Sequence, residues 1–415
     1  MALPPDDVIV LGAGAAGLAA AAALGRAGRA ALLIEARERV GGRCLTLRHP
    51  ALAVPVELGA EFIHGRPEAT LALLRKTRTP AVQSTRAQRM LWNARLVAVD
   101  AFAAARKATR KFPSGDDMSF RSFLGSQDLP PRIRALATMM VQGFDAADPR
   151  RASAREIAAE WGAEAIGASQ ARPAGGYGPL VETLARSGAR LQLQTVVREV
   201  AWRPGRVQVK GEFLGRPFRA EAKRAIVTLP LGVLQAGAVR FTPKLAQKQF
   251  SLSRLASGPV VRVALVFGSR FWARRFPQVA FFHSPAAPFP TFWTPLPARA
   301  PLLTAWAGGP KAARLTGRHP QELVQLALQT VEGVLRQKTD LAAAYVQDWQ
   351  ADPYARGGYS YVTVGGEGAR ELLAAPLQGT LFFAGEATNT TGESGTVGGA
   401  LQSGARAARE VLATL

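Results

Sequence analysis

The 415-residue sequence contains a single cysteine, Cys44, and only four histidines, at positions 49, 64, 283 and 319. One cysteine cannot form an internal disulfide bond. Histidines so far apart, with no second cysteine, do not have the spacing of a zinc site. We therefore predict no metal centre and expect the chemistry of this chain to depend on a bound cofactor.

The sequence also lacks a run of about 20 apolar residues of the kind that crosses a membrane. Asp6 and Asp7 lie where a secretory signal peptide would carry cations. Hydrophobic residues make up 48% of the chain and charged residues 20%, which is the balance of a globular protein with an ample core. These features predict a cytoplasmic protein with no membrane anchor, and the length favours two domains around a shared cleft.

Acidic residues are scarce relative to basic ones, since 30 Asp and Glu against 52 Lys and Arg give a formal net charge of +22. Such a charge is compatible with nucleic acid, an acidic membrane or an anionic substrate. The excess is mostly arginine and is spread along the chain, which favours a compositional bias over a binding stripe. No nucleic-acid partner is therefore expected, and the positive field would repel polycationic ligands at low salt.

Glycine, by contrast, is abundant, and three glycines follow an apolar run in VIVLGAGAAGLAAAAALGRAG, residues 8–28. The apolar start predicts a buried parallel strand and the Ala-rich remainder predicts a helix. Gly12 permits a tight turn, Gly14 lets the backbone approach a pyrophosphate at the helix amino end, and Gly17 allows close packing of helix and strand. The pattern predicts a dinucleotide-binding strand–turn–helix unit.

A second strand is predicted over residues 30–34, followed by Glu35, about 20 residues after the glycines. A carboxylate at this place accepts hydrogen bonds from a ribose and disfavours the 2′-phosphate of NADP. Gly41, Gly42 and Arg43 then supply another glycine turn and a cation for the same pyrophosphate. The sequence therefore predicts a site for a dinucleotide that lacks a 2′-phosphate.

The carboxyl-terminal stretch LFFAGEATNTTGESGTVGGALQSGARAAREVL predicts a strand over 381–384, an exit turn at Gly385 and Glu386, and a helix from Thr396 onward. The amino end of such a helix directs a positive dipole and free N–H groups at a nearby acceptor. This terminus therefore indicates a second ligand-binding element.

Together with six internal segments, these two ends of the chain resemble the flavin amine oxidases, the family of monoamine oxidases, polyamine oxidases and histone lysine demethylases. The segments occur in the family's order and are VELGAEFIHG (56–65), GGYGPLVETLA (175–185), LQLQTVVREVAW (191–202), AIVTLPLGVLQ (225–235), VALVFGSRFW (263–272) and DPYARGGYSYV (352–362). The resemblance covers nearly the whole chain. It implies FAD as the cofactor.

The resemblance also implies the architecture: an α/β fold in which a Rossmann-type FAD-binding domain of the GR2 type carries an inserted α+β substrate-binding domain. The FAD-binding domain would be discontinuous, at residues 1–75, 170–245 and 352–415, and the substrate-binding domain would take 76–169 and 246–351. Within the latter, residues 86–161 show a helix-like pattern, the segments 260–267 and 302–309 are typical of strands, and 320–336 has helical spacing.

Carried over position by position, the resemblance assigns the cofactor contacts to Gly12, Gly14, Ala15, Ala16, Gly17, Glu35, Ala36, Arg37, Gly41, Gly42, Arg43, Gly59, Ala60, Glu61, Val197, Gly385, Glu386, Gly395, Thr396 and Val397.

The reaction that the resemblance implies is oxidative deamination of a primary or secondary amine, by hydride transfer to flavin N5, with O2 or another compound as the final electron acceptor. Tyr359 matches one wall of the family's aromatic sandwich, and its alternative role is that of a core tyrosine. Thr396 matches the opposite wall, where monoamine oxidases have a second tyrosine, so the cage is half open. His64 matches a histidine near the substrate amine in polyamine oxidases, but it equally suits a loop cap.

Aromatic residues in one region, Phe281, Phe292, Trp293 and Trp306, are expected to line an apolar substrate channel, although core packing explains them as well. Together with the positive field, this channel favours an amine with an apolar or aromatic body over a polyamine.

Two positions depart from the family pattern. Arg262 stands where the family has a lysine that holds a water against flavin N5, and a planar guanidinium cannot reproduce a hydrated ammonium. Fast reoxidation by oxygen is therefore in doubt. Gly358 stands where monoamine oxidases carry the cysteine that bonds to FAD, so noncovalent FAD is expected.

Two alternatives remain at this point. One is an L-amino-acid oxidase, or a desaturase or dehydrogenase of the same superfamily, with Arg262 or Arg66 as the cation for an amino-acid carboxylate. The other is a basic nucleic-acid-binding protein in which FAD is structural.

Overall fold

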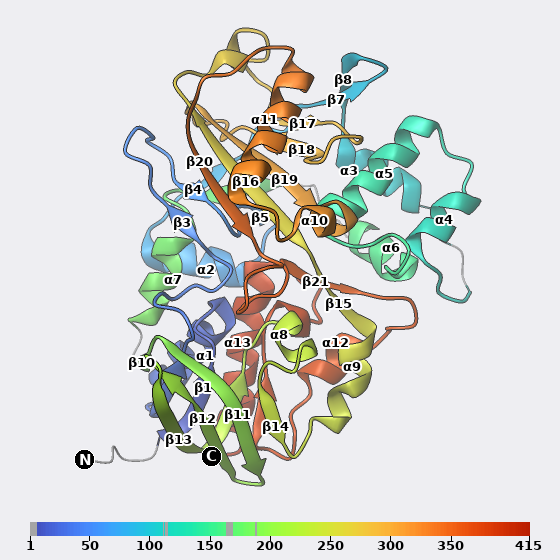
Figure 1. Ribbon diagram of the computed structural model, residues 1–415. Coiled ribbons are helices and arrows are strands. Elements are labelled where there is room, and N and C mark those ends of the chain that lie inside the picture. The colour runs from blue at the N-terminus through green and yellow to red at the C-terminus, as the bar shows by residue number, and fades with distance from the viewer. Residues whose placement is uncertain (1–5, 111, 113–114, 163–168, 187–188) are drawn as a thin grey trace.

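The computed structural model describes the whole chain except residues 1–5, 111, 113–114, 163–168 and 187–188. Figure 1 shows a large sheet with its helices in the lower half of the molecule, and a second sheet with a separate group of helices in the upper half. Both described ends of the chain lie in the lower half. The predicted α/β fold class is confirmed.

The large sheet has eight strands in the order β10-β2-β1-β13-β12-β11-β14, with β22 also paired to β13. Strands β10, β2, β1, β13 and β22 are parallel, whereas β11, β12 and β13 form an antiparallel meander. The strands are β1 (Asp6–Leu11), β2 (Ala31–Ile34), β10 (Arg190–Gln192), β11 (Thr195–Arg203), β12 (Arg206–Phe213), β13 (Arg216–Val227), β14 (Arg240–Thr242) and β22 (Leu381–Phe383).

Strand β1 leads through the glycine turn into α1 (Ala15–Arg26), as the opening sequence predicts. Gly12 has a φ of +102°, which glycine tolerates and other residues rarely adopt. A Cβ at Gly17 would collide with the carbonyl oxygen of Gly12, so only glycine allows this approach of helix and strand. The predicted helix at the other end is α13 (Val397–Leu412), which packs against α1, so both ends of the chain contribute helices to the same face of the large sheet.

The second sheet has seven strands in the order β20-β16-β19-β18-β17-β7-β8. The strands predicted over 260–267 and 302–309 are neighbouring inner strands of this sheet, and α11 (Pro320–Leu335) is the predicted helix that packs beside it. The strands are β7 (Gln88–Trp92), β8 (Arg95–Val99), β16 (Val260–Phe267), β17 (Phe281–His283), β18 (Thr291–Trp293), β19 (Leu302–Gly308) and β20 (Leu341–Asp348).

The helix-like prediction for residues 86–161 is wrong over its first part, where β7 and β8 form a hairpin. Asn93 and Ala94, the two residues between these strands, both have positive φ, at 46° and 61°. Such a two-residue connection matches the right-handed twist of a hairpin. The remainder is helical, with α3 (Ala101–Thr109), α4 (Phe120–Ser126), α5 (Pro131–Gly143) and α6 (Ala154–Gly162).

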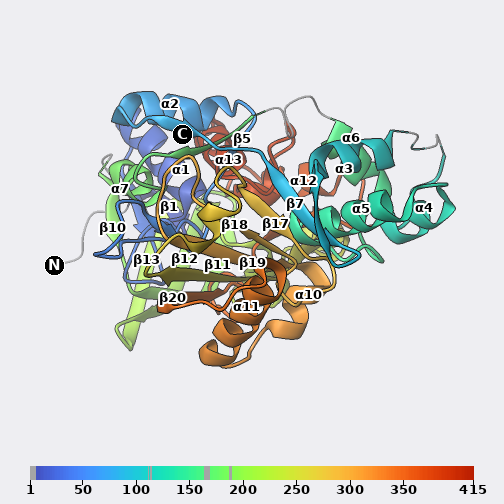
Figure 2. The same cartoon turned by 90° about the horizontal axis from the view of Figure 1, so that it is seen from above.

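Helices α3 to α6 form a separate layer, seen on the right in Figures 1 and 2. Their inward faces make a hydrophobic core of their own around Phe120, Phe123 and Trp161, all at most 1% exposed. The shorter elements join these layers and are β3 (Thr46–Leu47), β4 (Val56–Glu57), β5 (Ile63–His64), α2 (Glu68–Thr77), β6 (Ala81–Gln83), β9 (Gln170–Pro173), α7 (Gly178–Ala185), α8 (Leu231–Gln235), α9 (Gln249–Arg254), β15 (Leu255–Gly258), α10 (Gly309–Leu315), β21 (Tyr359–Val362) and α12 (Ala369–Ala374), with short 3-10 turns at Ala246–Lys248, Phe271–Arg274 and Glu386–Thr388.

Candidate active site

A continuous cavity begins at the turn between β1 and α1 and extends between the large sheet, the second sheet and the helical layer. It brings together nearly all the residues that the sequence assigns to a cofactor. The residues on that list that line the cavity are Gly12, Gly14, Ala15, Ala16, Glu35, Ala36, Arg37, Gly41, Gly42, Arg43, Gly59, Ala60, Glu61, Val197, Gly385, Glu386, Gly395, Thr396 and Val397. Gly17 instead packs α1 against the glycine turn.

The amino end of α1 is open to the cavity. Gly14 is the cap residue, and among the described residues no side chain caps the first N–H groups of the helix. A Cβ built on Gly14 would meet no protein atom within 4 Å. Unpaired N–H groups and the positive end of the helix dipole are suited to an anion such as a pyrophosphate.

The second glycine turn is tied to the first, because the Gly41 N–H donates to the Ala13 carbonyl at 2.8 Å. Glu35, at the end of β2, is buried, and its carboxylate accepts hydrogen bonds from the backbone N–H of Ala13, at 2.8 Å, and of Arg37, at 3.0 Å. The predicted ribose-binding carboxylate is thus fixed beside the helix amino end. This part of the cavity fits the phosphates and ribose of a dinucleotide.

A buried ion pair joins the two glycine-rich ends of the chain. Arg43 donates to Glu386 at 3.0 Å and to the Gly358 carbonyl at 2.5 Å. Burial alone would raise the pKa of Glu386, but the charges of Arg43 and Arg370, with a hydrogen bond from Ser360, hold it below its ordinary value. Glu386 therefore stays ionised and fixes the turn that follows β22.

Tyr359 lies farther along the cavity, against the backbone at Gly395. Its hydroxyl donates to the carbonyl oxygen of Phe144 at 2.6 Å, and the Trp306 Nε1–H donates to the Gly143 carbonyl at 2.9 Å. Burial raises the pKa of Tyr359 well above its ordinary value. The ring is thus held as a neutral wall of the cavity, next to Thr396, whose hydroxyl caps α13.

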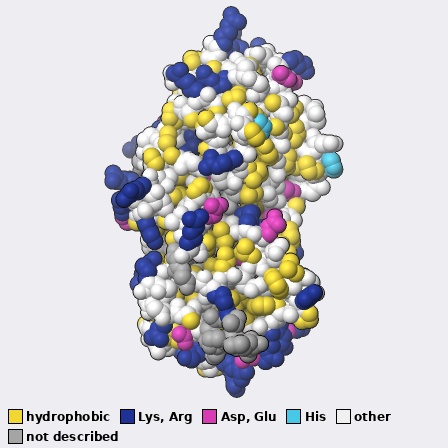
Figure 3. Space-filling model, turned by 90° about the vertical axis from the view of Figure 1, so that its left-hand side faces the viewer, with side chains coloured by type: hydrophobic (Ala, Val, Ile, Leu, Met, Phe, Trp, Pro, Cys, Tyr) yellow, Lys and Arg dark blue, Asp and Glu magenta, His cyan; other side chains and the backbone are white. Residues whose placement is uncertain are grey.

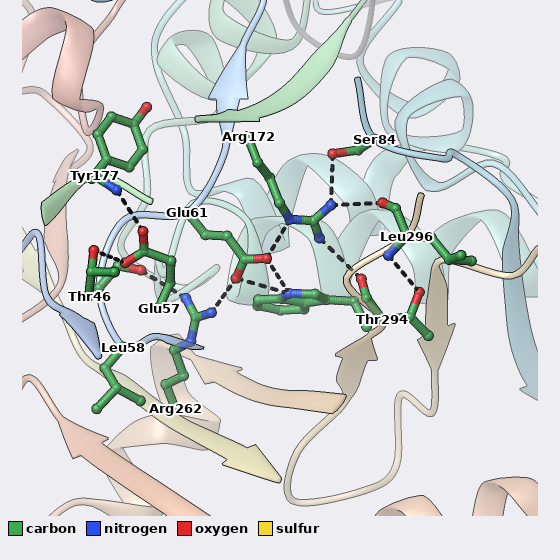
Figure 4. A network of polar contacts seen from close by, with 12 residues as sticks. Thr46, Glu57, Leu58, Glu61, Ser84, Arg172, Tyr177, Arg262, Thr294 and Leu296 are labelled. Atoms are coloured by element: carbon green, nitrogen blue, oxygen red, sulfur yellow. Dashed lines mark hydrogen bonds and ion pairs between the residues drawn. The ribbon is translucent and has the colours of Figure 1, made fainter. Parts of the chain in front are cut away.

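Arg262 belongs to a network with Glu61, Arg172 and Trp293 (Figure 4). It donates to Glu61 and, at 2.8 Å, to the carbonyl oxygen of Gly59. Arg172 donates to the other Glu61 oxygen at 2.6 Å. Burial would raise the pKa of Glu61, but the two guanidinium groups hold it below its ordinary value. Arg262 therefore has a fixed carboxylate partner, which it shares with Arg172.

His64 lines the cavity and contacts Phe144 edge-on, with ring centroids 5.2 Å apart. Burial lowers its pKa to about 4, so the imidazole is neutral at pH 7. No side-chain cap by His64 is seen among the described hydrogen bonds.

The predicted channel residues divide according to strand face. Phe281, Trp293 and Trp306 line the cavity, but Phe292 does not, so that prediction is wrong. Alternate residues of a strand point to opposite faces, and Phe292 stacks on Phe282 in the core, with centroids 5.0 Å apart. The cavity nevertheless has further aromatic lining residues that the sequence did not single out, among them Phe62, Phe102 and Phe144.

Several cavity residues were missed from the sequence. His283 donates to the Gln88 side-chain oxygen at 3.2 Å, because that oxygen already accepts from the Ala101 N–H and so acts as an acceptor. Asp145 and Glu160 line another part of the cavity. The two short apolar runs on either side of Asn93, at 90–92 and 96–99, could have indicated the hairpin that carries Gln88. No local signal marked the two acids.

Comparison with known proteins agrees with this geometry. The sequence model of a family described as flavin-containing amine oxidoreductase matches residues 15–412. Lysine-specific histone demethylase 2 of Homo sapiens is 28% identical over 452 residues, covering 99% of this chain and 54% of that protein. Polyamine oxidase 4 of Oryza sativa subsp. japonica is 27% identical over 445 residues, covering 98% of this chain and 88% of that protein. The chain thus spans little more than half of the human relative.

Solved structures share the fold. A putrescine oxidase bound to putrescine superposes with a TM-score of 0.81 at 20% identity, covering 99% of both chains. Cyclohexylamine oxidase from Brevibacterium oxydans superposes with a TM-score of 0.82 at 20% identity, covering 98% of this chain and 99% of that one. Across the described ranges, no helix combines the length and apolarity needed to cross a bilayer.

Proposed function

Because the chain belongs to the flavin-containing amine oxidoreductase family, we propose that it oxidises the C–N bond of a small-molecule amine. The observation that carries the proposal is the continuous cavity, which joins the open helix end at Gly14 to the aromatic wall at Tyr359. The chemistry that bound FAD supplies is the acceptance of a hydride, at N5, from the carbon next to the amine nitrogen, which leaves an imine to hydrolyse in water.

The residues of this chain fit FAD at both ends of that cavity. The open amino end of α1 and the glycine turn at Gly41 and Gly42 would hold the pyrophosphate, and Glu35 the ribose. Gly358 supports noncovalent binding, because a Cβ there would already lie 2.5 Å from the Val260 side chain. Acid precipitation should therefore release all of the yellow colour into the supernatant, and colour retained by the pellet would contradict this.

The chain's part in the reaction is to orient the amine and keep it unprotonated. Tyr359 and Trp306 give the cavity an aromatic wall, and such an apolar environment favours the neutral amine, whose lone pair is needed for oxidation. His64 is neutral and offers a ring nitrogen to the amine without adding a positive charge. These three residues are proposed as the substrate-orienting groups, with Thr396 leaving the opposite side of the cavity open.

The environment of Arg262 supports the proposal that the protein is a slow oxidase, or a dehydrogenase that passes its electrons to an acceptor other than oxygen. Its guanidinium is buried and bound to Glu61 and Gly59, so it does not present a hydrated ammonium. Arg262→Lys should raise the yield of peroxide per amine oxidised in air. A wild-type protein that is already reoxidised rapidly by oxygen would contradict this proposal.

The amino-acid oxidase alternative receives less support. Arg66 is exposed and is not among the described residues that line the cavity, and Arg262 is paired with Glu61, so neither suits a substrate carboxylate in this site. The nucleic-acid alternative requires a basic stripe, whereas Figure 3 shows Lys and Arg scattered over the face in view.

The experiment is anaerobic addition of a broad panel of amines and amino acids to the purified yellow protein, with flavin absorbance followed. Bleaching by amines supports the proposal. Bleaching by amino acids alone would select the first alternative, and strongly salt-dependent DNA binding without any bleaching would select the second.

A further inference from the structure

Strand β20 lies at one end of the second sheet, where one of its edges has no partner strand. Among the described residues, β20 pairs only with β16, in antiparallel orientation. The Trp349 N–H donates to the Val260 carbonyl at 3.0 Å, and bonding alternates along such a pair, so every second residue from Trp349 back to Ala343 bonds β16. Ala344 and Val346 therefore direct their N–H and C=O groups away from β16, and no other described group bonds them.

The features that usually protect a free strand edge are missing from β20. Proteins block such edges with Lys, Pro, bulges or very short strands. The eight residues of β20 read LAAAYVQD and include no Lys, Arg or Pro. An irregularity between Val266 and Phe267 of β16 affects only the start of β20, opposite Leu341. The edge at Ala344 and Val346 is thus regular and open to a further strand.

The free edge also lies in a groove whose walls are neutral. One wall is the amino end of α11, and the other comes from the region of β3 and β4. The lining residues are Leu47, Leu58, Pro320, Gln321, Val324, Gln325, Ala344, Tyr345 and Val346. None of them is charged, although charged residues make up 20% of the chain. Figure 1 shows β20 at the left-hand edge of the upper sheet, and Figure 3, which views the molecule from that side, shows many hydrophobic side chains on its upper half.

A partner for this groove must bring an unpaired strand edge without positive charge, because the whole chain carries +22 and repels cationic surfaces. A second copy of β20 meets both requirements. With a twofold axis at Tyr345, antiparallel pairing places Ala344 opposite Val346 of the partner subunit, and Val346 opposite Ala344 of the partner subunit. These two pairs exchange four hydrogen bonds, which use the four free groups of each edge. Tyr345 then faces its own copy, and cross-strand aromatic pairs are stabilising.

We propose that two copies of this chain associate through β20, edge to edge about a twofold axis at Tyr345. The two seven-stranded sheets then continue as one across the interface. The association needs neither flavin nor amine, so it can hold or fail independently of the proposed function.

The first test is disulfide trapping across the axis. Cys44, the one native cysteine, is 5% exposed, and burial raises its pKa to about 12, so it does not compete. In Tyr345→Cys the two Cα atoms would lie about 4.5 Å apart, within the range of about 4.4–6.8 Å that a disulfide spans. Ala343→Cys is the matched control, because Ala343 lies on the same face of β20 but about 14 Å from its copy. Mild oxidation should give a covalent dimer with Tyr345→Cys and none with Ala343→Cys or wild type.

The second test is sedimentation equilibrium of the wild type and of Ala344→Pro. Proline removes an N–H that does not bond β16, and such edge positions tolerate proline. Ala344→Gly is the control, because it keeps that N–H. We expect wild type and Ala344→Gly to dimerise, and Ala344→Pro to raise the dissociation constant of the dimer about tenfold or more. The dimer should also tighten as salt rises, because salt screens the repulsion between two positive chains.

Several results would overturn the proposal. They are a wild type that stays monomeric, a dimer that Ala344→Pro leaves intact, a dimer that salt dissociates, or equal trapping of the two cysteine variants. If Ala344→Pro does not fold, the cysteine pair decides the question, because both of those variants leave the backbone groups of β20 in place.

Discussion

Replacing Glu61 by glutamine tests the network of Figure 4 most directly. The side chains of Arg262, Glu61 and Arg172 are 2%, 10% and 15% exposed. The other hydrogen bonds that these two arginines donate go to neutral oxygens, such as the Gly59 carbonyl and the Ser84 hydroxyl. Glu61→Gln therefore leaves two guanidinium charges buried without their shared counter-charge.

Removing one partner of a buried ion pair costs about 3–5 kcal/mol. For a chain of 415 residues, with an unfolding entropy of about 2 cal/mol/K per residue, that corresponds to a fall in Tm of about 4–6 °C. The assay is thermal unfolding of the cofactor-free protein, so that flavin affinity does not enter the comparison. Glu322→Gln is the control, because its pair with Arg318 is exposed at 49% and 42% and should contribute less than about 1 kcal/mol.

The double variant Glu61→Gln, Arg262→Met identifies the cause. If the stranded charge of Arg262 is responsible, the double variant should be more stable than Glu61→Gln alone. A Tm for Glu61→Gln within about 1 °C of the Glu322→Gln value, which is about 1 kcal/mol or less for a chain of this length, would refute the reasoning.

Three further outcomes are expected. Gly14→Ala should weaken FAD binding while the Tm of the cofactor-free protein stays unchanged, because the added methyl group enters open space. Gly17→Ala should lower that Tm, because its methyl group meets the backbone at Gly12. Flavin titration measures the first effect and thermal unfolding the second, and equal behaviour of the two variants would contradict the assignment. Burial lowers the pKa of His283 to about 4 from 6.5, so protonation favours the unfolded chain, and stability is full above pH 6.5 and declines as the pH falls toward 4. His283→Asn should flatten that decline by up to about 1.4 kcal/mol per pH unit in an unfolding series, and an unchanged slope would exclude this group. Tyr359→Phe removes the hydrogen bond to Phe144 and should reduce the free energy of unfolding by about 1 kcal/mol. Flavin bleaching by amines should persist, since the Tyr359 hydroxyl is not proposed to transfer a proton. Complete loss of bleaching would show that the hydroxyl takes part in the chemistry.

The cofactor end of the site was largely predictable because its signals are local. Gly12, Gly14 and Gly17 occur where the backbone of one turn requires glycine, and Glu35 follows at a spacing set by a single strand–helix–strand unit. The family resemblance is confirmed along the chain, from residue 15 to residue 412, and with it the enzyme class and the FAD cofactor. The roles of individual site residues remain predictions.

The substrate end was less predictable because its residues meet only in three dimensions. Phe281 and Phe292 belong to paired strands, and which face each presents depends on the register of that pair. Arg172 and Glu61 are 111 positions apart, and Asp145 and Trp161 belong to different helical segments. The periodicity of a short stretch of sequence carries no information about such long-range contacts.

The helical layer that carries Asp145 and Glu160 has consequences for how this enzyme could diversify. Its core around Phe120, Phe123 and Trp161 is distinct from the cluster beneath the glycine turn. Exchanges at the cavity-facing ends of α5 and α6 would therefore leave the nucleotide-holding scaffold undisturbed. Selectivity for new amines can therefore evolve on the helical layer while the proposed cofactor site at the glycine turns stays unchanged.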